Sequence, residues 1–192
     1  MSGTNSIKQL IKYFLGHIRC RLNRIYPQKH VYIGKAVKIL KNPGGTIELS
    51  PEVIIRPYVD LWATGGHITV GAGTEIGERC RISISNELRI GNAVLFSPNV
   101  YVTDCDHEYR SIGVPVIHQG VVKNENRVEI GDGSYIGINS VIVGNVKIGK
   151  YCVVGANSVV TKDVPDYCVV VGSPAHVIKR YNPTLRVWER LA

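Results

Sequence analysis

The sequence predicts an all-β solenoid, a fold in which short strands stack coil upon coil around one narrow core. Three observations predict it. Aliphatic residues recur every six positions over long stretches, glycine is frequent with 20 of 192 residues, and large apolar residues are scarce, with one Met, two Phe and two Trp. Such a core must be built from Val and Ile, which are β-branched and suit a pleated surface.

The six-residue period is clearest in the second half of the chain, at Ile130, Ile136, Ile142, Ile148, Val154 and Val160. It also occurs at Val70, Ile76, Ile82 and Leu88, and resumes after a two-residue shift at Ile90, Phe96 and Val102. A period of six fits neither a helix face nor a simple alternating strand. It is typical of β-helix solenoids, in which each strand contributes one inward aliphatic residue. An antiparallel sandwich would instead alternate with period two between turns.

Two segments resemble the hexapeptide-repeat acyltransferases, the family of the maltose, galactoside and serine O-acetyltransferases and the xenobiotic acetyltransferases. They are GANSVVTKDVP at 155–165 and VVGSPAHVIKR at 170–180, and the resemblance extends over roughly residues 65–181. It implies a left-handed parallel β-helix with three faces per coil of about 18 residues. It further implies a homotrimer that uses acetyl-CoA as co-substrate.

The sequence pattern divides the chain into three parts. Residues 1–30 form an amphipathic helical segment, residues 31–181 the β-helix acyltransferase domain, and residues 182–192 a tail or a short C-terminal helix. Between Val102 and Ile130 the interval is 28 residues, which six does not divide, so a loop at about 108–128 must leave the solenoid. Pro115 and two glycines within it favour an excursion over a strand.

The amphipathic pattern near the N-terminus comes from apolar residues at steps of three and four, namely Ile7, Leu10, Ile11, Phe14, Ile18, Leu22 and Ile25. Residues 1–47 contain nine Lys or Arg and no acidic residue, and the formal charge of the chain is +8. The plainer interpretation, which we favour here, is an accessory helix packed on the domain. The sharper one is peripheral docking on an anionic membrane surface. The sequence contains no basic motif interleaved with aromatic residues, so we do not expect binding to nucleic acid.

Cysteine usage and hydropathy indicate the compartment. Five cysteines without a CxxC pair favour reduced thiols. We find neither an apolar run of the roughly 18 residues that a membrane span needs nor a signal-peptide block. We therefore expect a cytoplasmic protein, which would be peripheral at the inner membrane face if residues 1–30 dock there.

His107 is the candidate catalytic residue. It follows Val102, the last inward aliphatic residue before the loop, so its imidazole should lie on the rim of the solenoid. The segment IGNAVLFSPNVYVTDCDH is similar to the family segment that ends in the catalytic histidine, which implies that His107 is a general base. A neutral imidazole can take the proton of an alcohol that attacks a thioester and later protonate the leaving thiolate. The sequence leaves open whether Asp104, Asp106, Glu108 or a backbone carbonyl orients the ring.

The resemblance also implies a coenzyme A site in a groove between two subunits. Gly137 and Ala156 correspond to positions that border this groove. Positions near the adenine and phosphates correspond to Thr161, Lys162, His176 and Lys179, with Arg180 beside them. Tyr135 stands where the family commonly has Trp, and His176 where it often has Arg, whose permanent charge and forked donors would bind phosphate more strongly.

The predicted function is transfer of an acetyl group from acetyl-CoA to a sugar hydroxyl in a cell-surface glycan or its precursor, with no metal required. Small-sugar members of the family grip the acceptor with an Asn that has no clear counterpart around residues 79–81. The basic N-terminus is more similar to enzymes that acetylate surface polysaccharides.

Two alternatives belong to other classes. A gamma-class carbonic anhydrase-like zinc hydratase would draw on His67, His107 and His118, but the chain lacks the closely spaced C-terminal His pair of that class. The other alternative is a non-catalytic β-helix that binds or scaffolds other proteins.

Overall fold

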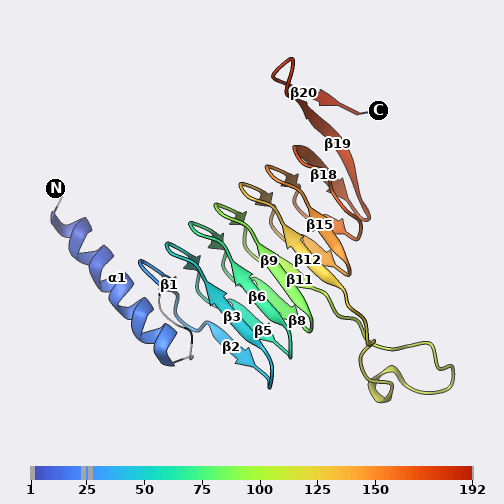
Figure 1. Ribbon diagram of the computed structural model, residues 1–192, viewed down its shortest axis with the longest axis horizontal. Coiled ribbons are helices and arrows are strands. Elements are labelled where there is room, and N and C mark those ends of the chain that lie inside the picture. Colours follow the sequence, from blue (N-terminus) through green and yellow to red (C-terminus); the bar gives the residue numbers. More distant parts are fainter. Residues whose placement is uncertain (1–2, 23–24, 26–27, 192) are drawn as a thin grey trace.

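The computed structural model describes residues 3–22, 25 and 28–191. The protein is a β-solenoid of about six turns preceded by a helix, α1 (Gly3–Leu22) (Figure 1). The solenoid is a left-handed parallel β-helix, so the predicted fold class is confirmed, and so is the predicted N-terminal helix. None of the helices in the described residues is long and apolar enough to cross a membrane.

Within the described part of the chain, the strands form three sheets of nine, six and five strands. Sheet A contains β1 (Tyr32–Ile33), β4 (Ile54–Ile55), β7 (Glu75–Ile76), β10 (Leu95–Phe96), β13 (Tyr135–Ile136), β16 (Val153–Val154), β18 (Cys168–Gly172), β19 (Ala175–Asn182) and β20 (Val187–Arg190). Sheet B contains β2 (Lys38–Lys41), β5 (Asp60–Ala63), β8 (Arg81–Ile84), β11 (Tyr101–Thr103), β14 (Val141–Val143) and β17 (Val159–Val160). Sheet C contains β3 (Thr46–Leu49), β6 (His67–Val70), β9 (Glu87–Ile90), β12 (Arg127–Ile130) and β15 (Val146–Ile148).

The core consists of columns of aliphatic side chains. In each column, the inward residue of one strand lies against the equivalent residue of the next strand in the same sheet. In sheet B the parallel register pairs Ile82 with Val102 and Val102 with Ile142, and all three side chains are completely buried. Burying one such side chain contributes roughly 1.5–3 kcal/mol. The six-residue period of the sequence is therefore the spacing between successive faces of one coil.

The two-residue shift in the sequence pattern has a structural cause. Strands of sheet C point two side chains inward, as in β9, where Leu88 and Ile90 are both buried. The early coils are also longer than the expected length of about 18 residues. Ile55 pairs with Ile76, 21 residues further on, whereas Ile136 pairs with Val154 after 18 residues. The additional residues lie in the turns from sheet B to sheet C, such as 42–45 and 64–66.

The corner between sheets A and B brings successive coils into close contact. A side-chain carbon at Gly137 would lie 2.7 Å from the backbone nitrogen of Ala156, so only glycine fits there. Two residues further on in each coil, Asn99, Asn139 and Asn157 adopt left-handed φ values of 60°, 58° and 57°. Their amides form a ladder with hydrogen bonds of 3.2 and 3.1 Å. Asn tolerates this conformation better than most residues, so the ladder fixes the stacking of the coils.

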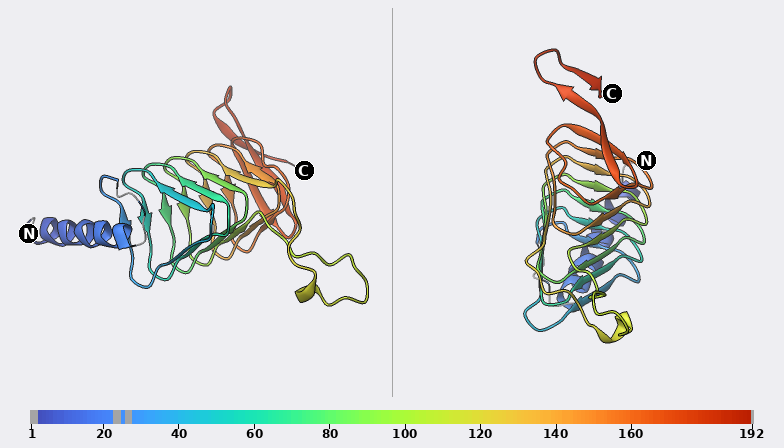
Figure 2. Two further views of the ribbon diagram at one scale, coloured as in Figure 1. Left: turned by 60° about the horizontal axis from the view of Figure 1, so that its bottom comes forward. Right: turned by 90° about the vertical axis from the view of Figure 1, so that its right-hand side faces the viewer.

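The predicted loop leaves the solenoid between β11 and β12 and projects well away from it (Figure 2). It contains a short 3-10 helix, η1 (Val116–His118). Its tip is apolar and exposed, with Ile112 at 96% and Ile117 at 84% of their full accessibility. The tip therefore makes little contact with its own chain.

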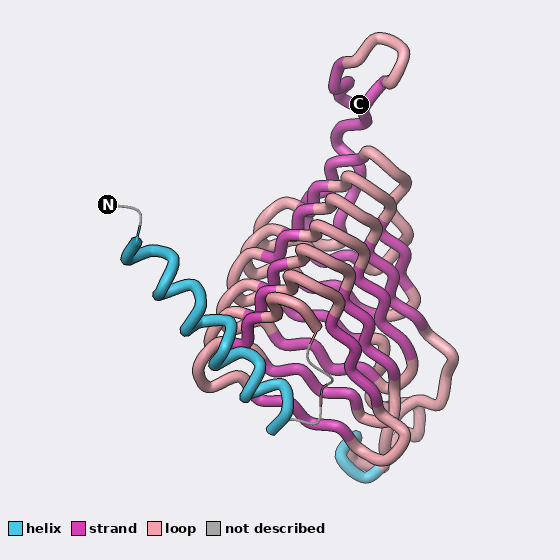
Figure 3. Tube along the Cα trace, turned by 60° about the vertical axis from the view of Figure 1, so that its left-hand side comes forward, coloured by secondary structure: helices cyan, strands magenta, loops and turns pink. Residues whose placement is uncertain are grey.

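The prediction of a short C-terminal helix is wrong. The chain instead ends in an antiparallel hairpin of β19 and β20 that extends sheet A beyond the last coil. The rings of Tyr181 and Trp188 meet across this hairpin at 5.5 Å. At the other end of the solenoid, helix α1 lies against the first coil at β1 (Figure 3). Helix α1 thus lies at one end of the parallel stack, and the antiparallel hairpin lies at the other end.

Candidate active site

His107 lies at the neck of the projecting loop, four residues beyond the end of β11. It forms an isolated antiparallel bridge with Val121, and the backbone nitrogen of Glu108 donates to the carbonyl of Gly120 at 3.0 Å. The side chain is exposed at the corner between sheets B and C. The imidazole therefore lies on the rim and outside the aliphatic core, as the sequence predicts.

Asp104, the first candidate for orienting the ring, is fully buried and has a different set of partners. Its carboxylate accepts hydrogen bonds from the backbone nitrogens of Ser85, Asn86 and Glu87 at 2.8, 2.7 and 2.9 Å. The nitrogens of Ser85 and Asn86 belong to the turn between β8 and β9, and that of Glu87 begins β9. Asp104 therefore holds the backbone of the preceding coil and does not contact the imidazole.

The other two carboxylates also bind backbone or arginine. Asp106 accepts a 2.8 Å hydrogen bond from the backbone nitrogen of His107. Glu108 accepts from the guanidinium of Arg110, with Nε at 2.7 Å, and this contact lowers the pKa of the Glu108 carboxyl to about 2. Among the residues that the structure describes, no hydrogen bond or ion pair involves the ring of His107. The ring is thus open to an incoming hydroxyl.

The residues predicted to bind coenzyme A divide into three places. Gly137 and Ala156 stack on each other at the corner between sheets A and B, in adjacent coils. Thr161 and Lys162 follow β17 and are exposed at the corner between sheets B and C. The remaining three, His176, Lys179 and Arg180, lie on β19 beyond the last coil.

A shallow cleft of about 380 Å³ lies on the outer side of sheet A, and its lining includes neither Gly137 nor Ala156. Its lining includes Tyr135, whose hydroxyl lies 2.8 Å from the Ser97 hydroxyl, and the ion pair of Arg56 and Glu75 at 2.6 Å. Sequence analysis singled out only Tyr135 here. The other residues were missed because they come from three coils and meet only through the strand register.

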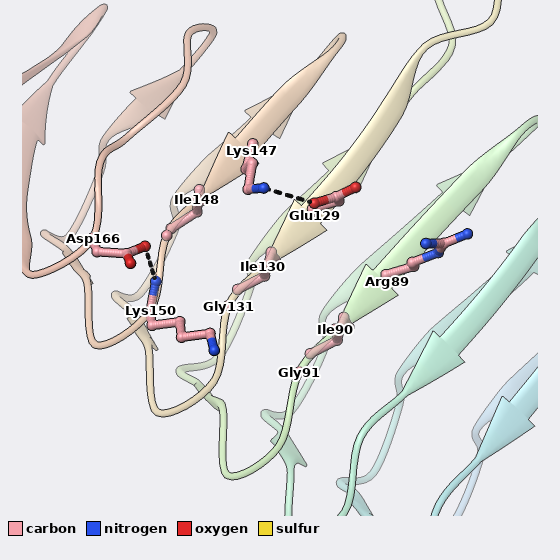
Figure 4. Close-up of a pocket in the computed structure, with 11 residues that line it drawn as sticks. Arg89, Ile90, Gly91, Glu129, Ile130, Gly131, Lys147, Ile148, Lys150 and Asp166 are labelled. Carbon is pink, nitrogen blue, oxygen red and sulfur yellow. Dashed lines mark hydrogen bonds and ion pairs between the residues drawn. The ribbon is translucent and has the colours of Figure 1, made fainter.

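A second groove of about 340 Å³ lies on the outer side of sheet C and contains none of the predicted site residues (Figure 4). Several of its charged side chains have partners within the groove. Lys147 lies 3.5 Å from Glu129, and Asp166 accepts from the backbone nitrogen of Lys150 at 2.9 Å. The groove therefore carries side chains of both charges.

A single chain does not bring His107 together with Gly137 and Ala156. His107 lies at the far end of sheet B from the corner that holds the two small residues. Within one chain, His107 and these two small residues therefore lie at opposite edges of sheet B.

The histidines of the zinc alternative are also dispersed. His67 lies on the outer face of sheet C with its Nδ1 2.8 Å from the Thr46 hydroxyl, and His118 lies in η1 of the loop. Over residues 3–22, 25 and 28–191, no group of three or more His, Cys, Asp or Glu side chains is placed to hold a metal ion.

Three parallel sheets with one loop inserted at a corner define the class of left-handed β-helix proteins to which acyltransferases belong. Residues 127–162 match the family described as bacterial transferase hexapeptide (six repeats), and the chain is similar to hexapeptide-repeat transferases.

Two curated proteins extend this similarity over most of the chain. A protein of Mycobacterium tuberculosis named a probable acetyltransferase is 32% identical over 150 residues, which are 78% of this chain and 49% of that protein. Galactoside O-acetyltransferase of Lactococcus lactis is 29% identical over 135 residues, 70% of this chain and 63% of the enzyme. This chain thus spans about half to two thirds of the length of these relatives.

A solved structure shares the fold. The N-acyltransferase AntD from Bacillus cereus, in complex with dTDP and 3-hydroxybutyryl-CoA, matches with a TM-score of 0.68 and 25% identity, covering 82% of this chain and 84% of AntD. The similarity extends over most of both chains, so the two proteins share the fold.

Proposed function

We propose that the protein is an acetyl-CoA-dependent O-acetyltransferase that acts on a sugar hydroxyl of a cell-surface glycan or its precursor. The observation that carries the proposal is the place of His107. In a chain similar to hexapeptide-repeat transferases, it is an exposed histidine on the rim, at the neck of the projecting loop, with its ring free of other partners.

His107 acts in this proposal as a general base and then as an acid. The neutral imidazole takes the proton of the acceptor hydroxyl while the hydroxyl oxygen attacks the thioester carbonyl. The resulting imidazolium gives the proton to the sulfur when the carbon–sulfur bond breaks. The products are an acetyl ester and free coenzyme A, and the enzyme returns to its starting state. Because both substrates must be bound together, much of the remaining acceleration comes from positioning.

The coenzyme is held, in the proposal, by the stacked small residues Gly137 and Ala156 along its pantetheine arm. Thr161, Lys162, His176, Lys179 and Arg180 lie near its adenine and phosphates. The flat ring of Tyr135, two residues before Gly137, lines the cleft on the outer side of sheet A. The acyl-CoA bound by AntD supports a coenzyme A site in this fold.

The assembly we infer is a homotrimer, supported by the outward faces of the sheets. Sheet C presents mostly charged or polar side chains: Thr46, Glu48, His67, Thr69, Glu87, Arg89, Arg127, Glu129 and Lys147. Sheets A and B present many apolar ones: Ile54, Leu95, Tyr135, Val153 and Val169, and Trp62, Tyr101, Val141, Val143 and Val159. Sheet A of one copy packs against sheet B of the next in a closed ring, which buries both apolar faces. The contact joins His107 of one copy to Tyr135 and Gly137 of its neighbour.

We also place the protein in the cytoplasm, in peripheral contact with the inner face of the membrane through residues 1–30. The basic composition of this segment suits an anionic surface. The apolar residues that helix α1 leaves exposed support the contact as well.

The experiment that tests the function follows thiol release from acetyl-CoA with a panel of polysaccharide fragments as acceptors. We expect His107→Ala to lower transfer by about 10²- to 10⁴-fold while coenzyme A affinity stays nearly unchanged. His118→Ala, in the same exposed loop, is the matched control and should keep its activity. Transfer by His107→Ala within tenfold of the parent would sink the assignment. Coenzyme A binding without turnover on any acceptor would favour a non-catalytic scaffold.

A further inference from the structure

The loop neck is anchored to the solenoid by one buried carboxylate. Asp104 is the first residue after β11 and has no exposed surface. Its Oδ1 accepts from the backbone nitrogen of Ser85, and its Oδ2 accepts from the backbone nitrogens of Asn86 and Glu87. Three donors thus converge on one side chain, and they come from the turn and the start of β9 in the preceding coil.

Asn86 joins this carboxylate to the returning arm of the loop. Its backbone nitrogen donates to Asp104 at 2.7 Å, and its side-chain amide donates to the Asn124 side chain at 3.0 Å. Asn126 donates in turn to the carbonyl of Asp104 at 3.2 Å. Both arms of the loop, the outgoing and the returning one, are therefore tied to the same turn.

Between these anchors, the backbone around His107 is paired at successive residues. The carbonyl of Asp106 accepts from the nitrogen of Val122 at 2.9 Å, and His107 itself bridges Val121. In the described part of the chain, no side chain forms a hydrogen bond or ion pair with the His107 ring. The place of the imidazole therefore depends on the backbone, and the backbone depends on the anchor at Asp104.

Other side chains at the same corner show what an ordinary turn cap looks like. Asn145 accepts from the backbone nitrogen of Arg127 at 3.0 Å, and Asp163 from that of Lys147 at 2.8 Å. Each accepts one backbone hydrogen bond, and Asp163 is exposed. Asp104 alone among these three is buried and accepts three. Only a carboxylate, which has acceptors on both oxygens, suits donors that arrive from both sides, because an amide would turn its NH₂ toward a donor.

We infer that Asp104 is a positioning residue that sets the imidazole of His107 for transfer by fixing the loop neck through Asn86 and Asn124. This inference rests on the proposed function. A displacement of about 1 Å at a reacting group can lower a rate about 100-fold. Loosening the anchor should therefore reduce turnover more than substrate binding.

The test compares Asp104→Asn with the matched isosteric control Asp163→Asn. For Asp104→Asn we expect kcat to fall about 10- to 100-fold, with the KM for acetyl-CoA nearly unchanged. Trypsin should cut the loop after Arg110 and Lys123 about tenfold or more faster, since the neck opens more often. Asp163→Asn should change neither quantity. A kcat within threefold of the parent together with parental cleavage rates would overturn the inference.

Two further measurements keep the outcomes separate. If Asp104→Asn fails to fold, Asn124→Ala is the second variant, because it removes a half-buried side chain that helps to hold the same loop neck. Unchanged kcat and cleavage in that variant would count against the inference. If the parent itself transfers no acetyl group, the proposed function fails, whereas the trypsin comparison still decides whether Asp104 anchors the loop.

Discussion

At Gly16, helix α1 lies so close to the first coil that a side-chain carbon there would be 2.4 Å from the carbonyl oxygen of Val31. Cys20, one turn further on, is buried on the same side of the helix. This contact fixes which face of the helix meets the solenoid. The bulky apolar residues lie on other faces and remain exposed, at 41–77% of their full accessibility: Leu10, Ile11, Phe14, Leu15, Ile18 and Leu22.

The exposed ridge of α1 predicts binding to anionic membranes. We expect the intact protein to sediment with vesicles of phosphatidylcholine and phosphatidylglycerol, and Phe14→Glu with Ile18→Glu to abolish this. The apolar ridge and the basic residues of segment 1–30 both contribute, at about 1 kcal/mol for each basic side chain that lies near the membrane surface. Thr69→Glu on sheet C is the control. Binding that is equal in the double variant and the parent, or that salt leaves unaltered, would contradict membrane docking.

The outward apolar face of sheet B predicts that one charge there disrupts the trimer. Val141 lies on the outer face of β14, whereas Thr69 lies on the polar outer face of sheet C. We expect Val141→Glu to convert a trimer to a monomer in analytical ultracentrifugation and to remove transfer activity, because a buried unpaired carboxylate is costly. Thr69→Glu should remain a trimer. A fully active monomer would show that no second copy is needed.

The contact between Glu108 and Arg110 predicts that the carboxyl group of Glu108 stays ionised at acidic pH. Because Arg110 lowers the pKa of Glu108 to about 2 from its ordinary 4.5, the pair stabilises the folded loop above the ordinary pKa. This stabilisation is lost as the pH falls through about 2. Carboxyl NMR of Glu108 should show this midpoint, and Arg110→Ala should raise it toward the ordinary value. Arg127→Ala is the control, and a midpoint that Arg110→Ala leaves in place would refute the assigned cause.

Burial predicts that one of the five thiols reacts in the native protein. Burial raises the pKa of Cys20 and Cys80 to about 11 and also raises that of Cys152 and Cys168, so these thiols carry little thiolate at neutral pH. Cys105 is half-exposed. Titration with Ellman's reagent at pH 8 should therefore find one fast thiol, which Cys105→Ser removes, and five after denaturation. Two or more fast native thiols would contradict the packing of the core.

Local sequence was informative where the structure repeats. The hexapeptide period predicts the columns through Ile82, Val102 and Ile142 because each short strand has one inward position and must fill it with an aliphatic side chain. The broken period predicts the loop for the same reason, since an excursion interrupts the count. The rim position of His107 follows from its distance to the last inward residue.

The C-terminal segment shows where local pattern failed. Residues 182–192 have no period strong enough to decide between helix and strand, and the outcome depends on β19, whose unpaired edge β20 covers. Edge groups that need hydrogen-bond partners are a property of the assembled sheet and are invisible in the segment itself.

By itself, the sequence determined the solenoid, the N-terminal helix, the loop and the rim position of His107, because these depend on spacing along the chain. Only the tertiary structure decided what Asp104 does, since its three donors lie 17–19 residues away and meet it through the register of one coil on the next. It likewise decided which face of α1 is free, because that depends on the close approach of Gly16 to Val31. Spacing sets which side chains point inward, whereas contacts between coils set which polar groups find partners.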